Sequence, residues 1–290
     1  MLKKILPDVI AIVAFVIISF AYFSPAVFQG RVLAGDDHVG MIGANQDAVD
    51  YRAQTGILSR WTNSVFSGMP NYQMAPSYDS LLPLKFFGKV YHLFLPTYVW
   101  YLFVLLTGFY LMLRVLGFPV LLSALGGVAW AFSSYFLIII GAGHIWKVMV
   151  LAYVPPTIAG ILLTYRGKYV AGGLLTAFFA ALQICGNHLQ MTYYFLFVIL
   201  FLVIAEAVKA FRAKEAARFF KATGVLVVAA LLAVAVNISN LYHTYEYSKE
   251  TMRGKGELVK ADSENQTASG LERDYITQWS YGIGETFSLL

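Results

Sequence analysis

The sequence predicts an all-α protein, a polytopic bundle of transmembrane helices. Hydrophobic residues make up 59% of its 290 residues and charged residues only 13%, whereas soluble domains are roughly 45–50% apolar and about 25% charged. Aromatic residues make up 16%, which excludes a disordered chain, because such chains are polar and poor in aromatic residues. Long apolar stretches recur along the chain, so we expect a multi-pass protein embedded in a lipid bilayer.

Seven apolar stretches are candidate spans, since about 20 helical residues cross a hydrocarbon core of roughly 30 Å. They are residues 5–23, 98–116, 120–140, 148–164, 170–185, 191–208 and 222–240. The fourth and fifth are short, and the fourth contains Pro155 and Pro156. Proline is tolerated in membrane helices where neighbouring groups satisfy the freed carbonyl. We therefore assign residues 1–240 to one transmembrane domain.

Basic residues predict the orientation, because Lys and Arg concentrate in short cytoplasmic loops. With a cytoplasmic N-terminus, the basic residues on the cytoplasmic side are Lys3, Lys4, Arg114, Arg166, Lys168, Lys209, Arg212, Lys214, Arg218 and Lys221. The short loops on the other side then contain only Lys147. We expect the first span to be retained, because residues 24–28 lack the small-residue pattern of a signal-peptide cleavage site.

Cysteine and charge exclude several other classes of protein. Cys185 is the only cysteine, so neither an intramolecular disulfide nor a zinc site with Cys/His spacing can form. The net charge is +5, which the cytoplasmic loops explain. We expect no nucleic-acid partner, because no soluble segment interleaves basic residues with aromatic ones.

Residues 24–97 form a long extracytoplasmic loop, and loops of this length usually carry structure or function. Helical spacing of apolar residues predicts a helix over residues 47–66, which residues 67–70 end. Residues 81–95 form an amphipathic candidate, with Lys85, Lys89 and His92 on one face. Such a helix suits the headgroup layer of a membrane, and the alternative is a membrane-proximal start to the second span.

A second polar segment covers residues 241–290, and we expect it to lie outside the cytoplasm. It is charged, and it ends at Thr286–Leu290 without a polar tail. We therefore expect the chain to be truncated, as the N-terminal part of a longer protein.

The first candidate site is Gly35–Asp36–Asp37–His38, shortly after the first span. Carboxylates at a membrane surface can act as general bases or hold a divalent cation. Asp36 and Asp37 are therefore candidate catalytic residues, and candidate metal ligands if the protein uses a metal. The alternative is an ordinary turn, with Asp47 as the N-cap of the helix that follows.

The second candidate site is Gly141–Lys147, between the third and fourth spans. The spacing of His144 and Lys147 puts both on one side of a helix. Together they could hold a phosphate in a partly desolvated site, where charge interactions are stronger than in water. The alternative is an interfacial histidine and a snorkelling lysine beside Trp146.

The third candidate site is the turn between the fifth and sixth spans, with Asn187, His188 and Gln190. Polar residues at membrane depth are costly and usually functional, although hydrogen bonding between helices is the alternative. The predicted topology puts all three candidate sites on the same face of the membrane.

The order and spacing of these motifs resemble the YfhO-like bacterial membrane proteins of the Bacteroidetes type, which belong to the broad group of GT-C-type glycosyltransferases. The segments that carry the resemblance are Gly35–Asp36, Trp61 with Phe66–Pro70, Gly143–Lys147 and Asn187–Tyr194. Each motif is moderately specific, and the resemblance covers essentially the whole chain.

This resemblance implies a GT-C-like fold in the bacterial inner membrane, with membrane-surface helices in the first extracytoplasmic loop. It implies transfer of a sugar from a polyprenyl-phosphate donor to a cell-envelope acceptor. An acidic residue early in that loop would act as base or metal ligand, and this position maps to Asp36 with Asp37 as its neighbour. Group members often carry a DxD or ExD pattern. The adjacent aspartates leave open which one is catalytic and whether a divalent cation is used.

The chemistry needs a base for the acceptor hydroxyl and a stabilising group for the departing lipid phosphate. We expect His144, Lys147 and His188 to serve the phosphate, with Asn187 and Gln190 as further substrate-binding residues. One displacement inverts the anomeric carbon, by analogy with glycoside hydrolases. Two alternatives are a lipid or sugar transporter or flippase, favoured only by Pro155–Pro156, and a non-catalytic membrane scaffold.

Overall fold

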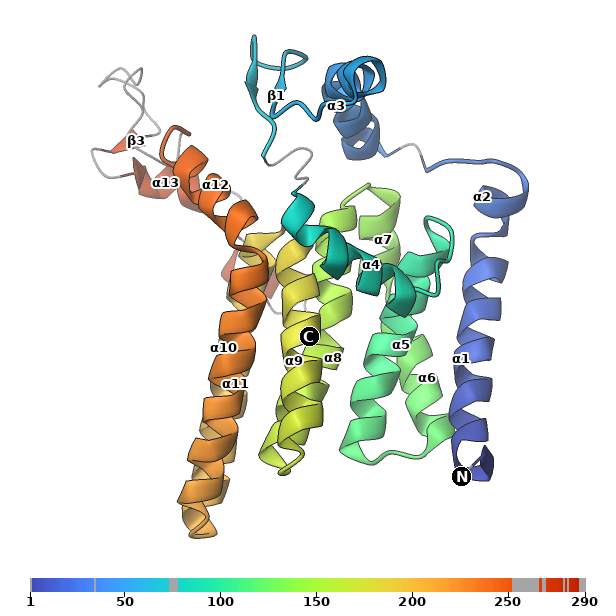
Figure 1. The fold of residues 1–290 in the computed structure, drawn as a ribbon, viewed down its shortest axis with the longest axis vertical. Coiled ribbons are helices and arrows are strands. Elements are labelled where there is room, and N and C mark those ends of the chain that lie inside the picture. The colour runs from blue at the N-terminus through green and yellow to red at the C-terminus, as the bar shows by residue number, and fades with distance from the viewer. Residues whose placement is uncertain are drawn as a thin grey trace. The chain divides into compact units, whose positions relative to one another are not determined.

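Helices dominate the computed structural model (Figure 1), in agreement with the predicted all-α class. The structure describes residues 2–33, 35–72, 78–251, 266–267, 270–278, 280 and 282–286. The chain divides into two compact units, Met1–Ser239 and Asn240–Leu290. Each unit is described separately.

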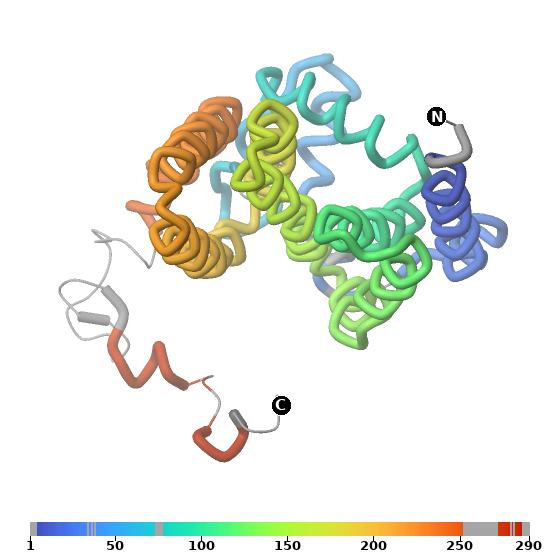
Figure 2. The backbone as a smooth tube through the Cα atoms, turned by 90° about the horizontal axis from the view of Figure 1, so that it is seen from below, coloured from blue at the N-terminus to red at the C-terminus, as the bar shows by residue number. Residues whose placement is uncertain are grey.

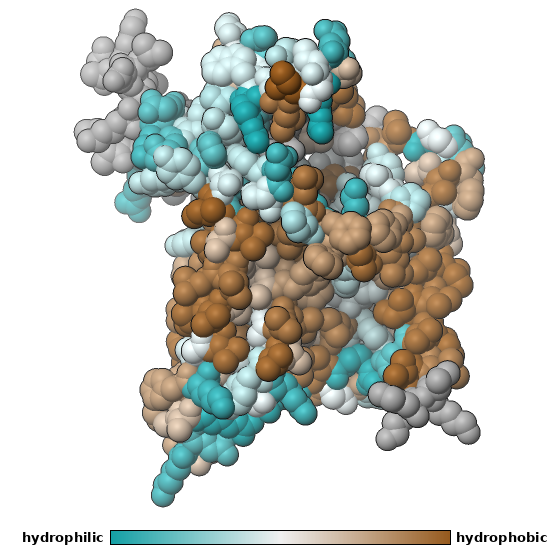
Figure 3. Space-filling view, viewed as in Figure 1, coloured by the Kyte–Doolittle hydropathy of each residue, from teal (hydrophilic) through white to brown (hydrophobic). Residues whose placement is uncertain are grey.

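Among the described residues of the first unit, five helices are long and apolar enough to cross a membrane. They are α1 (Leu2–Tyr22), α5 (Val99–Leu116), α8 (Ile145–Tyr165), α10 (Leu189–Arg212) and α11 (Ala216–Val236). A sixth span results if α6 (Val120–Ala131) and α7 (Ser134–Gly141), bent by 45°, count as one. Figure 3 shows their apolar side chains as a band with polar surface above and below it.

All seven stretches that the sequence predicts as spans are helical, and two of them differ from the five long helices. The stretch 170–185 forms α9 (Tyr169–Cys185), an apolar helix shorter than the five long ones. The stretch 120–140 is the bent pair α6–α7, because the chain leaves the helix at Phe132 and Ser133. The structure thus supports the prediction of a helical membrane protein, with five or six candidate spans among the described residues.

The helices of the first unit form a curved row, which is visible in Figure 2, where they are viewed end-on. It runs from α1 through α5 and α8 to α9 and α11. Helices α8 and α9 approach closely because glycines face each other's backbone. A Cβ on Gly160 would lie 2.5 Å from the Thr176 hydroxyl, and one on Gly172 would lie 2.5 Å from the Thr164 nitrogen. Small residues allow such approach between membrane helices.

The sequence predicts that prolines are tolerated in this span, and α8 is indeed not interrupted by them. The helix is continuous from Ile145 to Tyr165, and Pro155 and Pro156 are buried. Gly108 on α5 lies against this segment, since a Cβ there would lie 2.7 Å from the Ala152 carbonyl oxygen. The close packing of α5 supports the helix where proline removes a backbone donor.

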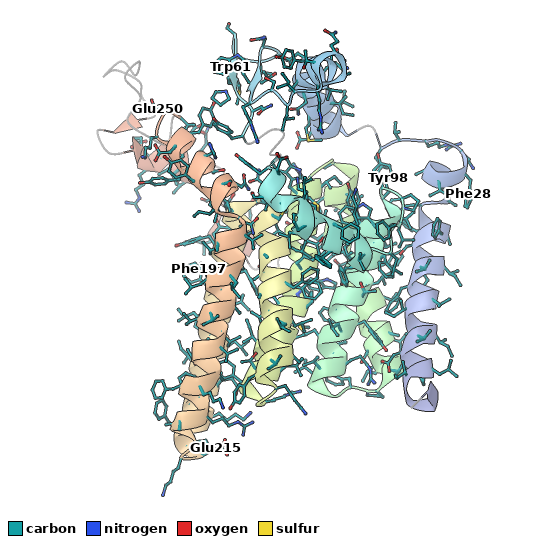
Figure 4. All side chains as sticks on the ribbon, viewed as in Figure 1. Phe28, Trp61, Tyr98, Phe197, Glu215 and Glu250 are labelled. Atoms are coloured by element: carbon teal, nitrogen blue, oxygen red, sulfur yellow. The ribbon has the colours of Figure 1, made fainter. Side chains whose placement is uncertain are left out.

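The long loop after α1 contains two short helices, a long helix and a small hairpin. Its elements are α2 (Ser24–Phe28), α3 (Asp36–Thr55), β1 (Trp61–Thr62), β2 (Met69–Pro70), the 3-10 turn η1 (Asp79–Leu81) and α4 (Leu82–Tyr91). Strands β1 and β2 pair antiparallel. Figure 4 labels Trp61 on this hairpin, where its ring lies over Gly68.

The helix predicted over residues 47–66 is wrong in its bounds, because α3 starts earlier and ends at Gly56 in the left-handed conformation. Asp47 therefore lies inside the helix and not at its N-cap. Its carboxylate accepts hydrogen bonds from the Thr62 hydroxyl at 2.9 Å and the Asn63 backbone N–H at 2.6 Å. The Asn63 bond is the main cause that lowers the pKa of Asp47, and it ties the hairpin to α3.

Helix α4 lies across the bundle (Figure 1) with Leu84 and Gly88 buried and Phe86 and Phe87 exposed. The sequence predicts one polar face with Lys85, Lys89 and His92; in the structure Lys89 is exposed, whereas Lys85 and His92 are half-buried. The His92 ring stacks on Trp100 with centroids 4.2 Å apart, and its Nε2 lies 2.6 Å from the Tyr153 hydroxyl. Desolvation lowers the pKa of His92 to about 4.

The second unit carries short elements along the part that the structure describes. Helix α12 (Ile238–Ser248) leads into it, and an antiparallel pair joins β3 (Gln266–Thr267) to β4 (Gly270–Leu271). The helices α13 (Arg273–Thr277) and α14 (Ile283–Thr286) follow.

Candidate functional site

A cavity of about 430 Å³ lies at the end of the bundle where α8 and α10 begin. We name it the rim cavity and this end of the bundle the site end. Its lining residues come from α3, α5 and the starts of α8 and α10: Asp37, Met41, Tyr101, Gly143, His144, Ile145, Trp146, Lys147, Met149 and His188. The rim cavity thus collects residues from all three candidate sites of the sequence analysis.

Gly35 explains how Asp37 reaches this cavity. A Cβ on Gly35 would lie 2.6 Å from the Gly141 carbonyl oxygen and 2.8 Å from the Ala142 carbonyl carbon. Since real Cβ atoms do not approach backbone so closely, glycine is required for this contact. It sets the first turn of α3 against the turn between α7 and α8. Asp36 begins α3, but its side chain lies outside the described part of the structure.

Asp37 and His144 form a pair across the cavity. The Asp37 Oδ2 lies 2.9 Å from the His144 Nδ1, and the two side chains are 61% and 43% exposed. His144 immediately precedes α8 and follows Gly143, whose φ of +89° suits glycine. A proton on Nδ1 that is donated to Asp37 leaves the Nε2 lone pair of a neutral imidazole free. The pair can therefore accept a proton from a bound hydroxyl group.

Lys147 and His188 supply two further polar groups of the lining, besides the Tyr101 hydroxyl and the Trp146 indole N–H. Lys147 lies in the first turn of α8 and is half-buried. Desolvation, and then the nearby Lys147 charge, lower the pKa of His188. The His188 imidazole is therefore neutral at neutral pH. Its Nδ1 is buried and has no hydrogen-bond partner among the residues that the structure describes.

The two remaining sequence candidates lie outside this lining. Asn187 occupies the turn before α10 with a φ of +56° and is 6% exposed. Gln190 donates from its Nε2 to the Tyr194 hydroxyl at 3.0 Å, on an exposed part of α10. The structure thus brings together Asp37, His144, Lys147 and His188, and it places the other two elsewhere.

Sequence reasoning missed Met41, Tyr101 and Met149 as lining residues. Tyr101 lies in the first turn of α5, in an apolar and aromatic run, and no local pattern distinguishes it from its neighbours. Met41 lies one turn after Asp37 on α3, a helix whose start the apolar periodicity did not show.

Of the two candidate metal ligands, Asp36 and Asp37, the structure describes the side chain of Asp37 only. Across the described side chains, no three His, Cys, Asp or Glu residues gather closely enough to hold an ion. The Asp37 carboxylate faces an imidazole Nδ1 instead. This contact suits proton transfer.

The chain matches no model of a known protein family, no curated protein and no solved structure. The chemistry available at the rim cavity follows from its groups: a carboxylate–imidazole pair, one lysine ammonium and one neutral imidazole. Together these groups can deprotonate a hydroxyl group and stabilise a phosphate.

Proposed function

We propose that the chain is a GT-C-type membrane glycosyltransferase. It transfers a sugar from a polyprenyl-phosphate carrier to an extracytoplasmic acceptor, a glycan or polymer of the bacterial cell envelope. One observation carries this proposal: the Asp37–His144 pair lines the same cavity as Lys147 and His188. A hydroxyl acceptor and a lipid phosphate are the two groups that such a lining suits.

The Asp37–His144 pair takes the acceptor proton. As the acceptor oxygen bonds to the anomeric carbon, the bond from that carbon to the phosphate oxygen breaks. The proton passes to His144 Nε2, and the Asp37 carboxylate stabilises the imidazolium that forms. This single displacement inverts the anomeric carbon. The resemblance favours Asp36 as base, and the test below includes it.

Lys147 and His188 stabilise the departing phosphate. The lysine ammonium offers a charge-assisted hydrogen bond, which is stronger than a neutral one. The neutral His188 donates from whichever ring nitrogen carries its proton. The desolvated wall around His188 strengthens both interactions.

The apolar helices and the basic loops support the proposed membrane location. Lys209, Arg212, Arg218 and Lys221 lie at the end of α10 and the start of α11, the end of the bundle away from the rim cavity. The positive-inside rule puts that end in the cytoplasm, so the rim cavity faces outward from the bacterial inner membrane. Helices α3 and α4 then correspond to the loop helices that the resemblance implies.

A transfer assay tests the proposal. The protein is reconstituted in vesicles with radiolabelled polyprenyl-phosphate sugars and cell-envelope acceptors. We expect transfer by the wild type, and a loss of about 100-fold or more for Asp37→Asn, because an acid–base group contributes about 10²–10⁴-fold. Asp36→Asn is compared beside it, and Asp50→Asn on the exposed part of α3 is the control. Wild-type rates from Asp37→Asn would exclude Asp37, and no donor consumption with any sugar would contradict the transferase.

A further inference from the structure

A second cavity lies inside the membrane-spanning part, between α8, α9, α10 and α11. Its volume is about 300 Å³ and its lining is almost wholly apolar. Representative lining residues are Ile161, Ala180, Phe195, Ile199, Leu226 and Ala230. We name it the interhelix cavity. It is separate from the rim cavity, because no residue lines both.

The interhelix cavity is open sideways to the bilayer. Leu196 on α10 and Val227 and Val234 on α11 line it and are between 40% and 54% exposed. Helix α10, whose residues are all described, has Phe195 as its single buried residue. Figure 4 labels Phe197 on this loosely packed helix. A hydrocarbon chain can therefore enter the cavity from the surrounding lipid without unfolding the bundle.

Six polar side chains interrupt the apolar lining. Four of them have hydrogen-bond partners within the protein: Thr157, Thr176, Tyr165 and Thr223. The other two are Gln183 and Thr192. Gln183 on α9 is 2% exposed, and Thr192 lies on α10. Their Nε2 and Oγ1 atoms are buried, and within the described ranges neither has a hydrogen-bond partner. Leaving a buried donor without a hydrogen bond is costly, so a ligand oxygen that accepts from it is favoured. The terminal torsion of glutamine is soft, so the Gln183 amide can turn toward an acceptor in the cavity.

Both groups lie at the same depth. Gln183 is in the last turn of α9, which ends at Cys185, and Thr192 is in the first turn of α10, which begins at Leu189. They therefore lie at the hydrocarbon boundary on the site end of the bundle. Ester carbonyls of glycerolipids occupy this level of a bilayer. The hydrocarbon of a polyprenyl chain carries no acceptor there.

We propose that the interhelix cavity binds an acyl chain of an ester-linked glycerolipid, with the ester carbonyl accepting a hydrogen bond from the Gln183 amide. Thr192 donates its hydroxyl to a second lipid oxygen. The apolar wall holds the chain along α10 and α11. This binding site needs no group of the rim cavity, so it stands apart from the proposed function.

Photolabelling tests the proposal on the whole chain in vesicles. The probe is a diacyl phospholipid with a photoreactive group in one acyl chain, and cross-linked peptides are mapped by mass spectrometry. The competitors are an unlabelled diacyl phospholipid and its dialkyl ether analogue, which lacks the carbonyls. We expect labelling of α10 and α11 at the cavity, with the ester lipid competing about fivefold better, as one hydrogen bond of about 1 kcal/mol implies.

Three variants make the test specific. Gln183→Leu should remove the preference for ester over ether lipid. Ala230→Phe should fill the cavity and abolish labelling, whereas Leu232→Phe, on the part of α11 that lines a different groove, should retain it. Equal competition by both lipids, displacement by polyprenyl phosphate as effective as by the ester lipid, or labelling spread evenly over the exposed helix faces would each overturn the proposal.

Discussion

Asp37, His144, Lys147 and His188 meet at one cavity although they come from three distant segments of the chain. Topology reasoning could predict that these residues share one face of the membrane, because spans reverse direction at each loop. It could not predict the 2.9 Å contact between Asp37 and His144, which depends on the close approach of Gly35 to the turn after α7. Topology reasoning also could not predict that Asn187 lies outside the lining. The direction of its side chain depends on the positive φ of the turn, which the sequence does not show.

His92 should make the stability of the fold depend on pH. Its pKa of about 4 lies below the ordinary value of 6.5, so the unfolded chain binds the proton more readily between these values. The stability that neutral His92 contributes is present above pH 6.5 and is lost as the pH falls toward 4. The loss is at most about 1.4 kcal/mol per pH unit. Thermal unfolding in detergent should show this decline in the wild type and a shallower one in His92→Gln. Equal pH slopes would contradict the prediction.

Among the elements, helix α3 shows why part of the fold could not be predicted from the sequence. The apolar residues of its first half, such as Val39 and Ile42, are interrupted by Gly40 and Gly43, so the apolar spacing predicts only the second half. The helix ends at Gly56 because that residue adopts the left-handed conformation, whereas the apolar spacing continues through the hairpin to Val65. The long apolar helices were predictable because lipid exposure requires a nearly unbroken apolar run.

Gly35→Ala tests how α3 positions the site. The added Cβ would lie 2.6 Å from the Gly141 carbonyl oxygen, so the first turn of α3 must move. A displacement of about 1 Å can cost about 100-fold in rate, and we expect a loss of that order in sugar transfer with little change in melting temperature. Gly40→Ala is the matched control on the same helix, because nothing lies within 4 Å of its Cβ position. Equal activity of the two variants would show that the contact does not position Asp37.

At the scale of the whole molecule, composition predicts a membrane protein, and the structure supports this class with five or six candidate spans in the part of the chain that it describes. The count of spans was less predictable, because length decides it and α6–α7 and α9 are interrupted or short. The sequence could predict that Pro155 and Pro156 are tolerated in α8, but it could not identify the neighbour that packs against them, which is α5 at Gly108.

Orientation is testable on the whole molecule. In a Cys185→Ala background, Asp50→Cys on α3 and Ala213→Cys between α10 and α11 each present one exposed thiol. We expect an impermeant thiol reagent to label Asp50→Cys in intact cells and Ala213→Cys only after permeabilisation. The reverse pattern would place the rim cavity in the cytoplasm.

The central claim is that Asp37 and His144 act as one proton-accepting unit in sugar transfer. Transfer rates of the wild type, Asp37→Asn, His144→Gln and the double variant test it directly. Groups that act as a unit are strongly non-additive, so the double variant should be no more than about twofold slower than the slower single variant. If the two losses multiply instead, the residues act independently and the pair is not the catalytic unit.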